Sequence, residues 1–201
     1  YTLSYTLSLH DALPISLGPV VDAFARLGVD YHIGGSVATS TFGEARSTLD
    51  VDVVAPIGEE HAAPLAAALR GDYYADEELI REAIRHRSSF NVIFLPQYFK
   101  IDVFVVKDTP YAKASFARHQ SARLVGAGST REFRFATPED VVLHKLDWYR
   151  QGGESSERQW SDVLGVLRVQ ATRLDRAYMR EWSTRLGIDD LLAKALAAAT
   201  A

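Results

Sequence analysis

The chain has 201 residues, of which 47% are hydrophobic and 24% are charged, and its formal net charge is −4. This length and composition predict one globular domain, alone or with a small appendage, with a core that needs no disulfide or zinc. The absence of cysteine excludes thiol catalysis and Cys-ligated metals and fits a cytoplasmic protein. The charge argues against nucleic-acid binding by the chain as a whole, although a local basic patch stays open, and no apolar run approaches the roughly 20 residues of a membrane span.

The first 16 residues, YTLSYTLSLHDALPIS, are interpreted as a segment foreign to the protein. The segment repeats its first four residues. The stretch from Thr6 to Ile15 is what the DNA string ACTCTTTCCCTACACGACGCTCTTCCGATC encodes, and that string resembles a sequencing-library adapter. We therefore exclude 1–16 from the fold prediction and place an α/β region at 17–136 and a helical region at 137–201.

Helical and strand patterns alternate along the α/β region. In chain order they predict a helix in PVVDAFARLG, a short strand in VDYHI, a brief helix in SVATSTFG, a strand in LDVDVVAPI, and helices in EEHAAPLAAALRG and DEELIREAIRHR. The next two runs, SFNVIFLP and FKIDVFVV, predict an antiparallel pair of strands joined by a turn. The region ends with a predicted helix in TPYAKASFARHQ and short strands in SARLVGA and REFRFAT.

From Thr137 onward the sequence predicts only helices. Thr137 fits an N-cap and Pro138 the first helical position, while Glu139 and Asp140 place acids in the first turn. Helices are predicted at about 138–150, 155–170, 175–186 and 188–199. The predicted fold class is therefore α+β, a mixed sheet flanked by helices with an all-helical C-terminal extension.

Two aspartates stand one residue apart in the predicted strand of LDVDVVAPI. Because alternate residues of a strand point to the same side, Asp50 and Asp52 share one face while Val51 and Val53 face a core. Two like charges a few ångströms apart repel each other unless a cation neutralises them, and Mg²⁺ prefers carboxylate oxygens. The pattern favours either a metal site or the plainer alternative, two aspartates on a solvated strand face.

Two further features favour the metal site. Gly34, Gly35 and Ser36 stand between a predicted strand and a predicted helix, where glycines let a ligand approach the backbone and N–H groups bind an anion. Ser36 also fits the N-cap of that helix. Asp102 interrupts the apolar run of FKIDVFVV, and if this strand lies beside 49–54 its carboxylate completes a cluster of three. The alternatives are an ordinary strand-to-helix turn and an acid at the edge of the sheet.

A Gly-Gly-Ser turn, Asp-x-Asp on a strand and a third acid on a later strand together resemble the DNA polymerase β-like nucleotidyltransferase superfamily. The matching residues are Gly35, Ser36, Asp50, Asp52 and Asp102. Among the small prokaryotic members of the superfamily, the sequence looks like the AbiEii-type toxin branch. The resemblance covers about residues 31–165. It implies a nucleotidyltransferase-like mixed sheet flanked by helices.

The resemblance also implies roles for residues outside the three acids. In ARSTLDVDVV, Arg46 and Thr48 precede the acids and are expected to contact the nucleotide. In toxin-like members a lysine in the first tail helix and an aspartate in the next complete the site, and those roles fall on Lys145 and Asp162. From the residues alone, Lys145 could equally extend to solvent beside an apolar stripe, and Asp162 could be an acid favoured near a helix N-terminus.

The reaction that the resemblance implies is transfer of a nucleoside monophosphate from an NTP such as ATP, with release of pyrophosphate. Asp50, Asp52 and Asp102 are expected to hold two Mg²⁺ or Mn²⁺ ions, and the turn from Gly34 to Ser36 the phosphates. Toxin-like relatives modify RNA, often tRNA, and others modify proteins or small molecules such as aminoglycosides. A toxin would imply an antitoxin-like protein partner. The alternative is a catalytically silent nucleotide-binding or toxin–antitoxin partner module with the same fold.

Other polar and aromatic residues have plainer interpretations. Arg81 and Arg85 are predicted to form a solvated basic face of one helix, with contact to a triphosphate or to RNA as the alternative. His32 is interpreted as a strand histidine. The three tryptophans of the tail are interpreted as packing residues.

Overall fold

The computed structural model describes residues 13, 15–44, 50–126 and 129–200. Arg46 and Thr48, which were expected to contact the nucleotide, lie outside the described residues, as does most of the segment 1–16. None of the helices in the described part of the chain is long and apolar enough to cross a membrane.

The described end of the segment 1–16 packs against the rest of the protein. The side chain of Leu13 is 1% exposed, and Ser16 is fully buried. The Tyr73 hydroxyl donates a hydrogen bond of 2.9 Å to the backbone carbonyl of Ser16. The foreign origin of the segment stays a prediction, but its last residues contribute to the core.

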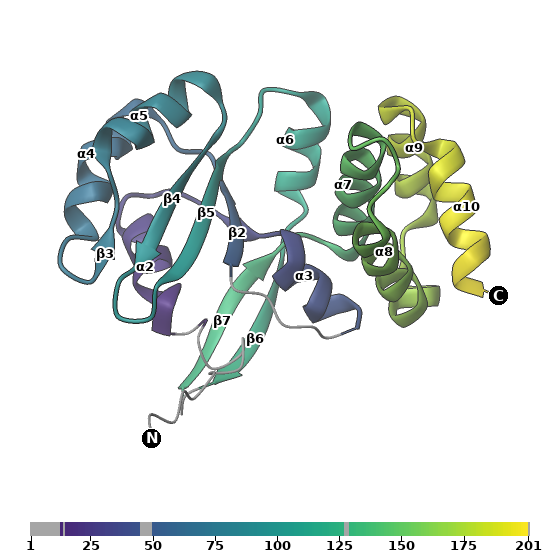
Figure 1. The fold of residues 1–201 in the computed structure, drawn as a ribbon, viewed down its shortest axis with the longest axis horizontal. Coiled ribbons are helices and arrows are strands. Elements are labelled where there is room, and N and C mark those ends of the chain that lie inside the picture. Colours follow the sequence, from purple (N-terminus) through teal and green to yellow (C-terminus); the bar gives the residue numbers. More distant parts are fainter. Residues whose placement is uncertain (1–12, 14, 45–49, 127–128, 201) are drawn as a thin grey trace.

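Seven strands in the described residues form one mixed sheet with the order β3-β4-β5-β2-β1-β7-β6 (Figure 1). The strands are β1 His32–Ile33, β2 Asp50–Ala55, β3 Tyr73–Tyr74, β4 Ser89–Phe94, β5 Phe99–Val105, β6 Gln120–Gly126 and β7 Ser129–Phe135. β2 runs parallel to β5 and β1 parallel to β7, whereas the other neighbours are antiparallel. The predicted strands and the antiparallel pairing of β4 with β5 are confirmed. The short strand β3 was not predicted.

The helices follow the predicted order. They are α2 Gly18–Arg26, α3 Gly35–Phe42, α4 Glu59–Ala68, α5 Glu77–His86, α6 Pro110–Ala117, α7 Pro138–Gln151, α8 Glu157–Gln170, α9 Arg176–Leu186 and α10 Asp189–Thr200, with a 3₁₀ turn at Ala171–Arg173. Thr137 is the N-cap of α7, as predicted, and its side chain accepts a hydrogen bond from the Asp140 N–H. The tail helices are confirmed to within one or two residues at each end.

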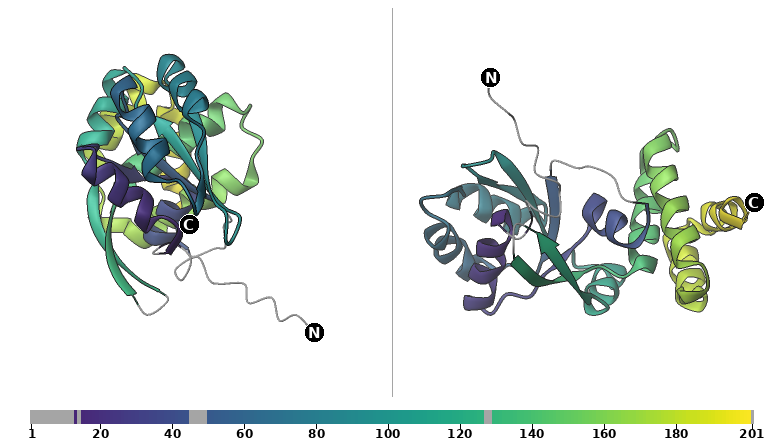
Figure 2. Two further views of the ribbon diagram at one scale, coloured as in Figure 1. Left: turned by 90° about the vertical axis from the view of Figure 1, so that its left-hand side faces the viewer. Right: turned by 90° about the horizontal axis from the view of Figure 1, so that it is seen from below.

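The elements form layers around the sheet. α2, α4 and α5 lie on one side of it, and α3 and then the helical tail α7–α10 lie on the other (Figures 1 and 2). α3 packs against both α7 and α8, so the tail rests on the helix that follows β1. The predicted fold class, a mixed α/β sheet flanked by helices with an all-helical C-terminal extension, is confirmed.

The two central parallel strands alternate between buried and partly exposed residues. The buried set is Val51, Val53 and Ala55 in β2 and Phe99, Ile101, Val103 and Val105 in β5. Apolar side chains on one face of a sheet drive that face into the core. The same alternation leaves Asp50, Asp52 and Asp102 together on the opposite face, toward α3.

A buried carboxylate joins the tail to α6. Asp140 is fully buried and accepts hydrogen bonds from the hydroxyls of Tyr111 (3.2 Å), Tyr178 (2.7 Å) and Thr137 (2.7 Å). The Arg118 guanidinium lies 3.8 Å from the centroid of the Tyr178 ring, and its Nε is 3.7 Å from Asp140. A buried carboxylate is tolerated only with such partners, so this network fixes how α7 sits against α6 and α9.

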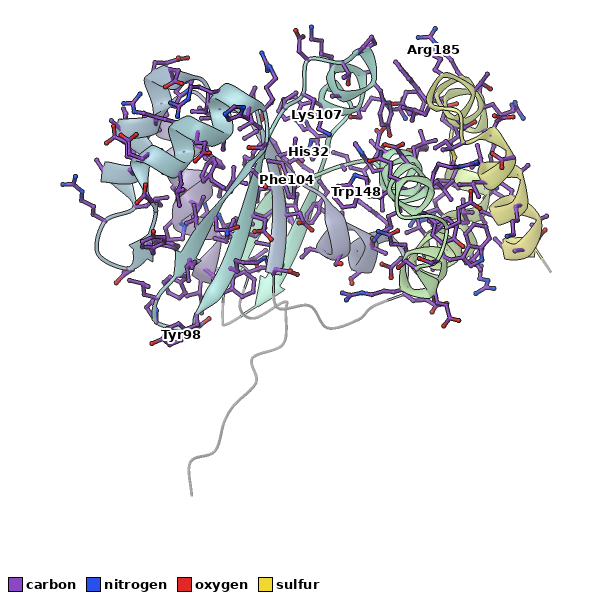
Figure 3. The ribbon with its side chains drawn as sticks, turned by 45° about the horizontal axis from the view of Figure 1, so that its top comes forward. His32, Tyr98, Phe104, Lys107, Trp148 and Arg185 are labelled. Carbon is purple, nitrogen blue, oxygen red and sulfur yellow. The ribbon has the colours of Figure 1, made fainter. Side chains whose placement is uncertain are left out.

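Tyr178→Phe is expected to lower the free energy of unfolding by about 1.5–3 kcal/mol, because it removes one hydroxyl donor from a buried carboxylate. The control is Tyr98→Phe, since Tyr98 is 84% exposed in the turn between β4 and β5 (Figure 3). That variant is expected to change stability by less than about 0.5 kcal/mol. Urea denaturation measures both, and equal losses in the two variants would contradict the role given to Asp140.

Candidate active site

The register of β2 and β5 places two aspartates side by side. Asp52 is paired with Asp102, and Asp50 is paired with Lys100. Paired residues of a parallel ladder point to the same face, so the three acids share one face of the sheet as predicted. The Asp50 side chain is 44% exposed and that of Asp102 is 15% exposed. The cluster therefore opens to solvent at its Asp50 end.

The turn that precedes α3 packs directly against Asp52. The Gly34 N–H donates a 2.9 Å hydrogen bond to the Asp52 backbone carbonyl, and the Ser36 N–H donates to the Asp52 carboxylate. A Cβ atom on Gly35, which has φ +52°, would lie 1.6 Å from Asp52 Oδ2. Only glycine allows that approach. Gly34 is the N-cap of α3, so the predicted capping role of Ser36 is wrong, and Ser36 is the second residue of the helix.

Burial and neighbouring charges raise the pKa of Asp52 together. Burial is the largest cause of the rise to about 6, and the charges of Asp50 and Asp102 add to it. The hydrogen bond from the Ser36 N–H and the charge of Lys145 act in the opposite direction. Crowded carboxylates of this kind are the electrostatic condition that a bound cation relieves.

One residue of the cluster, Lys100, was missed by sequence analysis. Its Nζ lies 2.7 Å from Asp102 Oδ2 and 4.0 Å from Asp50 Oδ2. The hydrogen bond to Asp102 is the main cause that raises the pKa of Lys100. A signal for it was present in FKIDVFVV, because the alternation that directs Asp102 to this face also directs the residue two positions earlier there.

Lys145 and Asp162 form a buried ion pair across two tail helices. Lys145 Nζ lies 2.8 Å from Asp162 Oδ2, and each residue is 9% exposed. Lys145 therefore does not extend to solvent, and Asp162 lies in the second turn of α8, so both plainer alternatives are wrong. The pair is close enough to the acids for the charge of Lys145 to lower the pKa of Asp52. The expected role of the pair in nucleotide binding stays a prediction.

Two other candidates have structural roles. Arg81 is ion-paired with Glu77 at 2.8 Å and with Glu59 at 3.0 Å on the helical surface. His32 is 2% exposed and its ring lies 5.2 Å from that of Phe116, and burial lowers the pKa of His32 to about 3. His32 is therefore a neutral packing residue of β1, as predicted.

The donor chemistry of the cluster fits a hard divalent cation, since Mg²⁺ and Mn²⁺ prefer carboxylate oxygens. As the side chains stand, however, no three acidic or histidine side chains among the described residues are placed to hold a metal ion. The Lys100 ammonium already neutralises part of this negative charge.

Two surface hollows, one between α2 and β7 and one at the ends of β2 and β5, are lined by residues outside the cluster of acids. The candidate site is thus an open polar face of the sheet.

Comparison with solved structures identifies the fold. The solution structure of the antibiotic-resistance factor ANT(2'')-Ia matches with a TM-score of 0.52 and 14% identity, over 93% of this chain and 94% of that one. An antigenic nucleotidyltransferase-like protein from Paracoccidioides brasiliensis matches with a TM-score of 0.54 and 16% identity, over 96% of this chain and 94% of that one. The chain has a nucleotidyltransferase fold. A crystal structure of ANT(2'')-Ia in complex with adenylyl-2''-tobramycin agrees, with a TM-score of 0.53 and 15% identity, over 87% of this chain and 97% of that one.

The sequence itself matches no protein-family model and no curated protein. At the low identities of the structural matches, the likeness concerns the nucleotidyltransferase fold and not the substrate. The fold expected from the superfamily resemblance is confirmed. The narrower assignment to the AbiEii-type branch stays a prediction.

Gly35→Ala is expected to lower the free energy of unfolding by about 2 kcal/mol or more, because the new methyl group forces strain at a positive φ and displaces the Asp52 carboxylate. The matched control is Gly34→Ala, since Gly34 has φ −116° and a Cβ there meets no atom within 4 Å. The control is expected to cost less than about 1 kcal/mol. Urea denaturation separates the two, and similar losses would contradict the contact between Gly35 and Asp52.

The pKa of Asp52 also predicts a pH dependence of stability. Because the pKa in the folded protein, about 6, exceeds the ordinary value of 3.8, folding favours the protonated group. This contribution is fully present below pH 3.8 and is lost as the pH rises through 6. Wild type is therefore expected to lose about 2 kcal/mol relative to Asp52→Asn between pH 4 and pH 7.5 in chelator. Glu82→Gln on the exposed surface of α5 is the control, and a constant wild type–Asp52→Asn difference across this range would contradict the shift.

Proposed function

We propose that this protein transfers a nucleoside monophosphate from an NTP to a hydroxyl acceptor and releases pyrophosphate. The observation that carries the proposal is the placement of Asp52 beside Asp102 on parallel strands, with Asp50 on the same face and Gly35 against the Asp52 carboxylate. The nucleotidyltransferase fold supports it, since one structural neighbour is a nucleotidyltransferase-like protein and another is bound to an adenylylated compound.

The three carboxylates provide the negative charge for divalent cations. Asp50, Asp52 and Asp102 would hold Mg²⁺ or Mn²⁺, which when bound supplies Lewis-acid charge to phosphoryl oxygens. Of the two aspartates that contact Lys100, Asp102 has the less exposed side chain, 15% against 44% for Asp50. We assign to Asp102 the acceptance of the proton from the attacking hydroxyl.

The phosphates of the NTP are assigned to the start of α3. The Ser36 side chain and the Gly35 N–H stand at a helix N-terminus, where partial positive charge favours an anion. The N–H groups of Gly34 and Ser36 are engaged with Asp52, so they position the carboxylate and not the phosphate. Arg46 and Thr48, in the segment before β2, are assigned as further nucleotide contacts.

The Lys145–Asp162 pair is assigned a preorganised electrostatic role. Because the Lys145 ammonium is buried and held by Asp162, its charge is fixed before a nucleotide binds. Fixed charges stabilise developing negative charge without reorganisation during the reaction. The assignment is supported by the effect of Lys145 on the pKa of Asp52.

We propose a small molecule as the acceptor. The formal net charge of −4 disfavours a large contact with RNA. A structural neighbour is bound to adenylyl-2''-tobramycin, in which the nucleotide is joined to a small hydroxyl-bearing compound. RNA as the acceptor, a toxin role, an antitoxin-like partner and a cytoplasmic location stay predictions from the sequence.

Asp50→Asn is expected to reduce NTP-dependent pyrophosphate release by at least about 100-fold, because it removes a carboxylate that would hold the cation. The assay combines purified protein, Mg²⁺ or Mn²⁺, each NTP in turn, and either aminoglycosides or total tRNA. Mass spectrometry of the acceptors identifies the product. Asp50→Asn is expected to fold at least as stably as wild type, since one repulsion within the cluster is removed.

The outcomes separate the candidate functions. Glu82→Gln, at an exposed acid of α5, is the matched control and is expected to retain wild-type turnover. Undiminished turnover in Asp50→Asn would falsify the assignment of the carboxylates. Metal-dependent NTP binding without pyrophosphate release by wild type would favour the silent nucleotide-binding module. Labelled tRNA with unmodified small molecules would overturn the choice of acceptor.

A further inference from the structure

We propose that Lys100 is a built-in counter-ion of the carboxylate cluster, which a divalent cation must displace when it binds. The inference rests on the proposed function and concerns the metal affinity of the same site. It makes Lys100 a positioning residue, because it would act on the reaction through the acids and not through the substrate.

The geometry places the Lys100 ammonium against two of the three acids. Its Nζ is 2.7 Å from Asp102 Oδ2 and 4.0 Å from Asp50 Oδ2. Register explains this position, since Lys100 is paired with Asp50 on β2 and lies two residues before Asp102 on β5. The three side chains therefore lie on one face of the sheet, and the Lys100 side chain reaches both carboxylates without crossing the strand.

An ammonium at this position and a divalent cation compete for the same oxygens. An Asp102 oxygen that accepts a hydrogen bond from Lys100 must exchange that partner for the ion. Two positive charges within a few ångströms of one another also repel, so Lys100 has to move as the ion enters. While Lys100 lies against Asp102, no three acidic or histidine side chains among the described residues are placed to hold a metal ion.

Exposure distinguishes Lys100 from the other lysine that acts on the cluster. The Lys100 side chain is 43% exposed, whereas the side chains of Lys145 and Asp162 are 11% and 8% exposed. A half-exposed ammonium can leave its carboxylate and be solvated at little cost, but a buried one cannot. Lys100 is therefore the exchangeable cation of the site, and Lys145 is the permanent one.

The test compares metal binding by Lys100→Met, Lys100→Arg and a surface control. Lys100→Met keeps the length of the side chain and removes its charge, so Mn²⁺ is expected to bind about three- to tenfold more tightly. Without metal the same variant is expected to melt at a lower temperature than wild type, because the repulsion among the acids is less compensated. Lys100→Arg keeps the charge and is expected to retain the wild-type affinity or a weaker one.

The control is Lys113→Met, which removes a more exposed lysine–aspartate ion pair away from the cluster, the one with Asp108. It is expected to leave the Mn²⁺ affinity unchanged. Binding is measured on metal-stripped protein by electron paramagnetic resonance of free Mn²⁺ and by calorimetry, with melting temperatures in chelator and in saturating Mn²⁺. The gain in melting temperature on adding Mn²⁺ is expected to be larger for Lys100→Met than for wild type.

The results separate this inference from the proposed function. If Lys100→Met lowers the metal-free melting temperature but does not tighten Mn²⁺ binding, Lys100 is a purely structural ion pair and the inference is overturned. In that case, wild-type pyrophosphate release that depends on Asp50 would leave the proposed function standing. If wild type binds no Mn²⁺ and releases no pyrophosphate with any NTP, both fail together.

Discussion

Like-charge repulsion across one pair of parallel strands is the constraint around which this structure is arranged. The buried faces of β2 and β5 fix their register, because a slip of one residue would turn their apolar side chains away from the core. That register places Asp52 directly beside Asp102. Hydrophobic packing on one face of the sheet therefore holds two carboxylates together on the other face against their mutual repulsion.

Three separate parts of the fold offset this repulsion, each in a different way. The start of α3 donates the Ser36 N–H to the Asp52 carboxylate, and Gly35 makes room for it. β5 supplies the half-exposed Lys100, and α7 supplies the buried Lys145. Burial, and after it the charges of Asp50 and Asp102, still raise the pKa of Asp52 to about 6 in spite of these groups. Surplus negative charge and an exchangeable ammonium are what the proposed binding of a divalent cation with an NTP requires of this site.

The sequence predicted what depends on local pattern and missed what depends on contacts between distant elements. Alternation and capping gave the central strands and the four tail helices, and the spacing of the acids gave their common face. Pairing of β2 with β5 was only a condition of that prediction, because no local signal specifies which strands become neighbours. Ser36 was wrongly predicted as the N-cap of α3 because serine is common at N-caps. The N-cap is Gly34, and the helix starts at Gly35, which contacts Asp52. The Lys145–Asp162 pair needed the packing of α7 on α8 before its burial could be known.

The buried ion pair also bears on how the tail relates to the sheet. A lysine and an aspartate buried together are seldom worth their desolvation for stability alone, so their retention calls for another reason. We propose that the reason is electrostatic, since the charge of Lys145 lowers the pKa of Asp52. Lys145 lies near Asp52 only because α7 and α8 pack on α3. This packing is close, since a Cβ atom added to Gly43, just after α3, would lie 2.9 Å from the backbone N of Val166 in α8. The boundary predicted at 136–137 separates regions that differ in secondary structure, yet the candidate site draws on both. The helical tail is therefore part of the proposed active site, because without it the carboxylates lose the buried, permanent charge of Lys145.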